Sequence, residues 1–214
     1  EAVMSLNDCL ETGPPLQNLL WDVLVQNRIK PIALAGDMKQ AFLQIRIRPE
    51  DRDVLRFHWV QNKNPSSIIT LRFTRALFGL VQSPFLLAGT LKVHLNKLKE
   101  KYPSEVEEIQ KSLYVDDIIT GGETEEEVAD LKKTTIAIFE EAAFTLHKWN
   151  SNKPALEGEL EQRDGEQSYA KQKLCVNPGE TKLLGLPWDK KRDMIAVTFP
   201  KSPPDVTKRE MLRF

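Results

Sequence analysis

One stretch of the chain, LYVDDII at residues 113–119, places Asp116 and Asp117 side by side between two apolar runs. Short apolar runs that contain β-branched residues favour buried strands, so we expect the two aspartates at a tight hairpin turn. Two carboxylates in such a place repel each other, and burial without a partner raises the pKa of at least one of them. A divalent cation relieves this repulsion, and ligands that are all oxygen favour Mg²⁺ or Mn²⁺ over zinc.

A third aspartate, Asp37, follows another apolar run of strand length, Ile32–Ala35. Ligand sites of open α/β sheets gather at the carboxyl ends of strands, which is where Asp37 would lie. Apolar periodicity and the positions of proline and glycine predict the other elements. We expect helices at 15–27, 85–98 and 123–141, and strands at 43–47, 54–60, 68–73, 182–188 and 194–199, with 54–73 forming a β-hairpin. This order indicates an α+β fold rather than regular βαβ repetition.

The composition is that of a globular protein, with 214 residues of which 41% are hydrophobic. No stretch approaches the roughly 18 apolar residues of a membrane span, so no membrane association is expected. A net charge of −1 argues against a protein that simply coats nucleic acid. Residues 28–75 contain ten Lys and Arg against four Asp and Glu, whereas residues 105–141 contain three against twelve. This polarity indicates either a phosphate-facing side opposite a metal-binding side or an ordinary solvated surface.

The cysteines and histidines argue against zinc. Cys9 and Cys175 are far apart and form no CxxC motif, so a reducing compartment fits better than a disulfide framework. The three histidines are scattered, without Glu or Cys partners at ligand spacing, which disfavours a zinc hydrolase. An Asp-Asp pair alone is also weak evidence, because chance can produce one in a chain with 12 aspartates.

The full pattern Tyr114-Val115-Asp116-Asp117 between apolar runs resembles the hairpin signature of reverse transcriptases. Upstream, DMKQAF at residues 37–42 resembles the first palm motif of that family. The resemblance implies that Asp37, the Met38 carbonyl, Asp116 and Asp117 bind metal and that the three aspartates are catalytic. It also implies that Ala41 and Phe42 contact the nucleotide. Phe42 would exclude the 2′-hydroxyl as a steric gate, unless it is simply a core aromatic residue.

Three further segments resemble motifs of the same family, in the family's order. FGLVQSP at 78–84 resembles the second motif, which implies nucleotide contact by Gln82 and template–primer contact by Gly79, Ser83 and Pro84. Ser83 and Pro84 also suit the N-cap and the first position of a helix. FTLHKW at 144–149 and LGLPW at 184–188 resemble the segments that approach the triphosphate and grip the primer. The resemblance implies that Lys148 contacts the nucleotide; the alternative is an ordinary solvated lysine. It also implies that Leu184 and Gly185, together with Tyr114, contact template and primer.

The resemblance implies an α+β polymerase palm, a ferredoxin-like antiparallel sheet with helices on one face, with partial fingers. Residues 1–30 would be partial fingers and a leading helix, and residues 31–200 the palm, with a fingers insertion around 43–75 and a mobile loop at 157–173. Residues 201–214 would begin the thumb or connection. The basic fingers strand of the family would fall before Glu1, so we interpret the chain as a piece of a longer protein. One departure is Phe78, where retroviral enzymes have Gln.

The implied activity is RNA-directed DNA polymerisation: two Mg²⁺ ions, with Mn²⁺ as the alternative, support addition of a dNTP to a primer 3′-hydroxyl on an RNA or DNA template. The segments 5–8, 185–189 and 207–210 are similar to BEL/Pao retrotransposons, which carry long terminal repeats. This implies ribonuclease H, protease and integrase domains in the same polyprotein and a cytoplasmic particle, or the nucleus, as the location. The alternatives are a palm-type nucleotidyl cyclase and a non-catalytic polymerase remnant, and we expect the isolated fragment to be inactive.

Overall fold

The computed structural model describes residues 4–61, 67–157 and 181–197, and it divides the chain into two compact units, Glu1–Trp149 and Asn150–Phe214. Each unit is described by itself. Most of the loop expected at 157–173 and all of the segment 201–214 lie outside the described residues.

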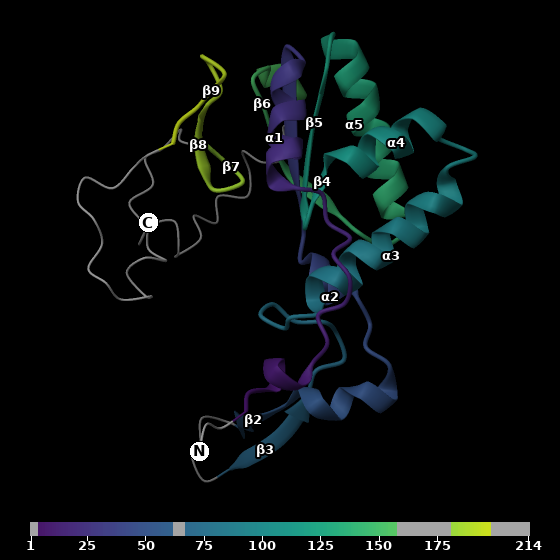
Figure 1. Cartoon of the computed structure of the whole chain (residues 1–214), viewed down its shortest axis with the longest axis vertical. Helices are drawn as coiled ribbons and strands as arrows, with labels where there is room; N and C mark the ends of the chain where they lie inside the picture. The colour runs from purple at the N-terminus through teal and green to yellow at the C-terminus, as the bar shows by residue number, and fades with distance from the viewer. Residues whose placement is uncertain (1–3, 62–66, 158–180, 198–214) are drawn as a thin grey trace, which may run out of the picture. The chain divides into compact units, whose positions relative to one another are not determined.

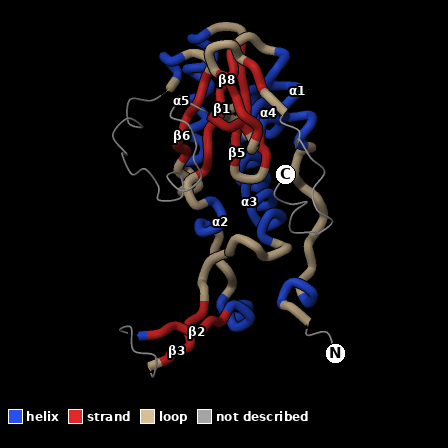
Figure 2. Tube along the Cα trace, turned by 90° about the vertical axis from the view of Figure 1, so that its left-hand side faces the viewer, coloured by secondary structure: helices blue, strands red, loops and turns tan. Residues whose placement is uncertain are grey.

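The first unit is built on a four-stranded sheet, seen face-on in Figure 2, with the strand order β4-β5-β1-β6. The strands are β1 (Ile32–Met38), β4 (Leu113–Tyr114), β5 (Asp117–Gly122) and β6 (Leu146–Ser151). β5 pairs antiparallel with both β1 and β4. With helices between β1 and β4 and between β5 and β6, the chain order is β-α-β-β-α-β, as in ferredoxin-like folds. The α+β palm-like architecture expected from the sequence is confirmed.

Helices α3 (Ser83–Leu98), α4 (Pro103–Ser112) and α5 (Glu125–Glu140) form the helical layer beside the sheet. α5 begins where Thr124 accepts a hydrogen bond from the Glu127 amide, and three glutamates in its first turn suit the positive end of the helix dipole. Its Val128 side chain packs so closely on Gly122 of β5 that a Cβ there would overlap it. The helices expected at 85–98 and 123–141 are thereby confirmed.

Helix α1 (Leu20–Ile29) lies beside β5, next to α4 in Figure 2. β4 pairs with only the first two residues of β5, and side chains of α1 and of its C-cap residue donate hydrogen bonds to the carbonyls beyond them. Asn27 donates to the Thr120 carbonyl at 3.0 Å, and Lys30 donates to the Gly121 carbonyl at 3.0 Å. The helix expected at 15–27 therefore begins five residues late, because residues 15–19 are not helical and Leu19 is extended.

The strand expected at 43–47 is wrong. Residues Ala41–Gln44 form a short helix, α2, which turns Ala41 and Phe42 into the core, and only Arg46 makes a bridge, to Arg75. The period-two alternation that suggested a strand arises here from one helical turn followed by Ile45, whose amide bonds the Phe42 carbonyl.

The β-hairpin expected at 54–73 is confirmed, with β2 (Arg56–Val60) antiparallel to β3 (Ile68–Arg72). Arg56 and Arg72 lie opposite each other, and both pair with Asp53 at 2.6 Å. Hydrogen bonds from these two guanidinium groups, from Arg72 first, lower the pKa of the Asp53 carboxyl. This relieves the repulsion expected between two like charges directly opposite in a sheet.

The second unit contains β7 (Thr181–Leu183), β8 (Leu186–Asp189) and β9 (Met194–Ile195) in one antiparallel sheet. The single strand expected at 182–188 is a hairpin, because Leu184 and Gly185 adopt φ of +49° and +84° and reverse the chain. Within the described ranges no helix is long and apolar enough to cross a bilayer.

Candidate active site

The three aspartates come together at one end of the four-stranded sheet. Asp37, near the end of β1, is the direct cross-strand partner of Asp117 at the start of β5. Asp116 precedes it in the turn, and its carbonyl accepts a hydrogen bond of 2.8 Å from the Met38 amide. The antiparallel register thus places side chains 80 residues apart in the sequence beside one another.

The hairpin turn that carries Asp116 has an unusual backbone. Tyr114 pairs with Asp117, so Val115 and Asp116 form a two-residue turn, and Val115 has a φ of +54°. A β-branched residue in the left-handed region costs about 1–3 kcal/mol and persists only where surrounding structure enforces it. The neighbouring register and the hydrogen bond from Met38 supply that constraint.

The electrostatics of the carboxylates reflect their crowding. Burial, followed by the charges of Asp116 and Asp37, raises the pKa of Asp117 to about 6, although Lys148 acts in the opposite direction. Burial also raises the pKa of Asp116, and the charge of Asp37 adds to this effect. These are carboxylates that lack sufficient positive charge nearby, as the sequence analysis expected.

Asp37 differs from the other two because the side chains of Lys148 and His147 contact it. Its Oδ2 atom accepts a hydrogen bond from Lys148 Nζ at 2.8 Å and lies 2.9 Å from His147 Nε2. Successive residues of a strand normally point to opposite faces. Lys148 has a φ of +50°, which breaks this alternation, so both neighbours reach the same oxygen.

In the described part of the chain no three Asp, Glu, His or Cys side chains are already arranged to hold a metal ion. The Oδ2 atom of Asp37, a potential metal ligand, is already in contact with Lys148 and His147. The donor set nevertheless suits a hard divalent cation: all three acids offer oxygen, and the raised pKa values of Asp116 and Asp117 show uncompensated negative charge. Asp37, Asp116 and Asp117 therefore fit such an ion once the ammonium of Lys148 moves aside.

Phe42, five residues after Asp37, packs against the ring of Phe78. Phe42 is 5% exposed, and the two rings meet edge to face with centroids 4.7 Å apart. Phe78 is 64% exposed, so it forms an outer aromatic surface next to the buried ring. The side chain of Ala41 is completely buried.

The second-motif segment forms a loop that leads into α3. Gly79 has a φ of +87°, which favours glycine there. Gln82, rather than Ser83, is the N-cap of α3, while the Ser83 hydroxyl donates to the Leu77 carbonyl at 2.7 Å. Pro84 is the second residue of α3, one position later than expected. The Oε1 atom of Gln82 is buried and has no hydrogen-bond partner among the described residues.

Tyr114, Leu184 and Gly185 are the remaining predicted residues. Tyr114 is half-buried on β4, one residue before the turn. Leu184 and Gly185 form the β7–β8 turn of the second unit. The structure thus brings together Asp37, Asp116, Asp117 and Lys148.

Sequence reasoning missed three side chains that belong to this region. His147 was considered only as a zinc ligand, yet it lies against Asp37. Asn7 and Asn18, in the N-terminal segment, hydrogen-bond the second-motif loop and the base of the hairpin. No local sequence signal identifies the asparagines, because their partners lie far along the chain.

The sheet order and the acidic hairpin at its end define a polymerase-type palm. A family comparison agrees: residues 6–156 match Reverse transcriptase (RNA-dependent DNA polymerase). The chain belongs to the reverse transcriptase family. Its members are RNA-directed DNA polymerases that bind template, primer and dNTP and generally use divalent metal ions. A comparison with curated protein sequences returns no match.

Proposed function

We propose that this chain is the catalytic palm of a reverse transcriptase in which Asp37, Asp116 and Asp117 bind two Mg²⁺ ions, with Mn²⁺ as the alternative. The reaction adds a dNTP to the 3′-hydroxyl of a primer on an RNA or DNA template. The observation that carries this proposal is the pairing of Asp37 with Asp117, next to Asp116 in the turn.

The bound ions would activate the primer hydroxyl and neutralise charge that develops on the phosphates. The chain's own residues provide the binding and the geometry. The carboxylates of Asp116 and Asp117, with pKa values raised by burial and mutual repulsion, supply the negative charge that makes cation binding favourable. The Met38 carbonyl would be a further oxygen ligand.

Lys148 has two partners in this proposal. It holds Asp37 when no cation is bound, and its side chain, 61% exposed, would turn to the triphosphate when a cation displaces it. Phe42, backed by the Phe78 ring, would form the wall beneath the incoming sugar, and Ala41 and Gln82 would line the nucleotide site. Gly79, Ser83, Pro84, Tyr114, Leu184 and Gly185 would contact template and primer.

The test is primer extension by a longer protein that contains this palm. Asp116→Asn should lower the metal-dependent rate by roughly two to four orders of magnitude, because a neutral amide cannot replace a carboxylate that binds the cation. Asp130→Asn, which removes an exposed acid from α5, is the matched control and should retain the activity. Near-normal extension by Asp116→Asn would refute the assignment.

The parent protein would be a polyprotein of a BEL/Pao retrotransposon, with ribonuclease H, protease and integrase domains. Its reverse transcription would take place in cytoplasmic particles, or in the nucleus. The support is the similarity of the segments 5–8, 185–189 and 207–210 to that group.

A second candidate is a non-catalytic remnant, and one observation favours it: Asp37 is already paired with Lys148 and His147. In this case the isolated chain would not bind Mg²⁺ and would be inactive. A palm-type nucleotidyl cyclase is the other alternative. Template-dependent incorporation of labelled dNTP separates the polymerase from both, because a cyclase needs no template and a remnant incorporates nothing.

A further inference from the structure

The segment Ser5–Asn18, which we call the strap, runs alongside α3 on its way to α1 (Figure 1). Gly13, at φ +78°, lies directly on the Phe85 ring, where an added Cβ would overlap the ring. One helical turn further along α3, a Cβ at Gly89 would lie 3.8 Å from the Leu16 side chain. The strap therefore follows α3 as an ordered part of the first unit.

At its first end the strap holds the second-motif loop through Asn7. The Asn7 amide donates to the Gly79 carbonyl at 2.8 Å, and its oxygen accepts from the Val81 amide at 3.2 Å. The turn that presents Asn7 is itself fixed, because Asp8 accepts hydrogen bonds of 2.8 Å from both the hydroxyl and the amide of Ser5. One side chain thus uses donor and acceptor together on a single loop.

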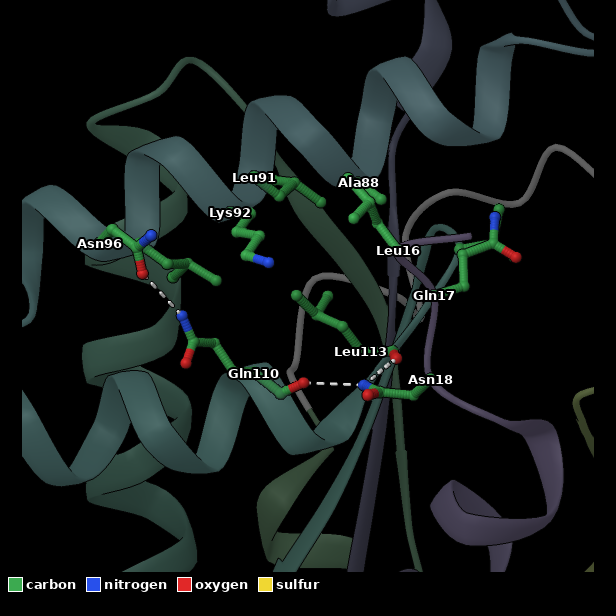
Figure 3. Close-up of a pocket in the computed structure, with 11 residues that line it drawn as sticks. Leu16, Gln17, Asn18, Ala88, Leu91, Lys92, Asn96, Gln110 and Leu113 are labelled. Carbon is green, nitrogen blue, oxygen red and sulfur yellow. Dashed lines mark hydrogen bonds between the residues drawn. The ribbon is translucent and has the colours of Figure 1, made fainter. Parts of the chain in front are cut away.

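At its other end the strap holds the base of the catalytic hairpin through Asn18. Figure 3 shows the Asn18 amide between two backbone carbonyls, Gln110 at 2.7 Å and Leu113 at 2.9 Å. Gln110 belongs to the last turn of α4, where carbonyls lack partners within the helix, and Leu113 is the first residue of β4. Asn18 therefore joins the helix end to the strand that leads to Val115 and Asp116.

A cavity of about 270 Å³ beside Asn18 explains why these hydrogen bonds matter. Its walls come from the strap, α3, α4 and the hairpin, and they include Leu16, Leu91, Leu113 and Val115. Figure 3 shows the first three of these residues around the cavity. Side-chain packing is incomplete on this side of the hairpin, so packing alone leaves it room to shift. The Asn18 hydrogen bonds supply the missing restraint.

We propose that Asn7 and Asn18 are positioning residues: the strap fixes the distance between the loop at 79–81 and the hairpin that carries Asp116. Neither asparagine touches the reacting groups. The consequence for catalysis rests on the proposed function, since it matters only if the loop and the hairpin face one substrate. The restraint of the hairpin does not depend on that function.

The first experiment is amide hydrogen exchange on the 214-residue chain. Asn18→Asp preserves the shape of the side chain but places a carboxylate against two carbonyls, so both hydrogen bonds are lost. Exchange of the Met38 amide, which donates to the Asp116 carbonyl, and of the amides of the β4–β5 hairpin should then accelerate about tenfold, while α5 amides stay unchanged. Gln17→Glu, the same change of amide to acid on the same cavity wall, should leave the hairpin amides as in the wild type.

Equal exchange in Asn18→Asp and the wild type, or an acceleration spread evenly over the whole unit, would overturn the proposal. If Asn18→Asp does not fold, Asn18→Gln keeps a donor with a longer reach and should accelerate the same amides by less. Asn7→Asp retains the acceptor for the Val81 amide and should loosen the 79–81 loop alone.

The second experiment measures kinetics in a longer, active protein. Asn18→Asp and Asn7→Asp should each lower kcat about tenfold with the KM for template–primer little changed, because misplacement affects the transition state rather than nucleic-acid binding. If the strap acts as a unit, the double variant should lose less than the product of the two effects. A rise in KM alone would overturn the positioning role. If the wild-type protein has no polymerase activity but Asn18→Asp still accelerates exchange in the hairpin, the proposed function is refuted and the restraint by the strap is retained.

Discussion

At the scale of single residues, the site is governed by an imbalance of charge. Three carboxylates share one end of the sheet, whereas Lys148 and His147 contact only one of them, Asp37. Asp117 is the group most affected, with a pKa raised to about 6 by burial and by its two acidic neighbours. The negative charge that suits a cation should therefore lower the stability of the metal-free protein.

This imbalance predicts that Asp117→Asn stabilises the metal-free protein in a pH-dependent way. The pKa of the Asp117 carboxyl is higher in the folded than in the unfolded protein. Between about pH 4 and 6 the carboxyl is therefore protonated in the folded protein and ionised in the unfolded chain. As a result, the wild-type free energy of unfolding falls as the pH rises through that window. With a discount for partial exposure, we expect the variant to gain about 1–2 kcal/mol at pH 7.5 and little at pH 4. Urea denaturation in metal-free buffer measures both values.

Asp130→Asn is the control for this prediction, since it removes an exposed acid from α5 in the same unit. An equal gain for Asp117→Asn at both pH values would show that the carboxylate charge is not the cause.

The residues of the site were only partly predictable. The convergence of Asp37 with Asp116 and Asp117 follows from the motif order and an antiparallel sheet. The contacts of Lys148 and His147 with Asp37 could not be predicted in this way. They depend on the positive φ of Lys148, and a lysine at that position gives no sign of such a backbone conformation. Asn7 and Asn18 were missed because an isolated asparagine in a polar segment looks like any turn residue.

At the scale of elements, a side chain of β6 packs directly on the backbone of β1. The ring of Trp149 lies over Gly36, where an added Cβ would be 2.7 Å from two ring atoms. Trp149 is 6% exposed, and Lys132 of α5 lies over its ring, 5.1 Å from the centroid. The absence of a side chain at position 36 is therefore required for this packing.

Gly36→Ala should lower the free energy of unfolding by about 1–3 kcal/mol, because a methyl group in this position forces the ring or the strand to move. Gly89→Ala is the matched control, since a Cβ there meets only the Leu16 side chain at 3.8 Å and replaces a glycine inside α3. It should be neutral or stabilise the protein by up to about 1 kcal/mol. Thermal or urea unfolding of both variants measures these changes in the free energy of unfolding. An unchanged free energy of unfolding in Gly36→Ala would contradict the tight packing of Trp149 on Gly36.

The prediction of elements succeeded where local signals agreed. α5 combines strong helix formers with an acidic first turn, and the strands of the 54–73 hairpin are rich in β-branched and aromatic residues. α4 received no assignment, although Pro103 at its start and the spacing of Val106 and Ile109 suit a helix. The start of α1 was misplaced because the tertiary hydrogen bonds of Asn18 hold the preceding residues outside the helix.

At the scale of the whole molecule, the β2–β3 hairpin presents apolar side chains at the surface. The β2–β3 hairpin places Phe57, Trp59, Ile69, Leu71 and Phe73 on one face, and Trp59 is 55% exposed. Its other face carries Arg56 and Arg72. A two-stranded hairpin with an exposed apolar face and open edges favours self-association.

Trp59→Lys should reduce this self-association, because a charge in the centre of the apolar face makes face-to-face contact unfavourable. We expect light scattering at high protein concentration to fall several-fold while the circular dichroism spectrum is unchanged. Val93→Lys, which changes another exposed apolar residue, 58% exposed on α3, is the control. Equal scattering by Trp59→Lys and the wild type would exclude the hairpin face as the cause.

The contacts of Lys148 and His147 with Asp37 have a further consequence for handling the protein. Because Lys148 and His147 already contact Asp37, removal of the cation does not leave all three acids without a partner. The protein should therefore survive purification and storage with a chelator in a folded, dormant form. In a longer, active protein, adding back Mg²⁺ should restore primer extension without a refolding step.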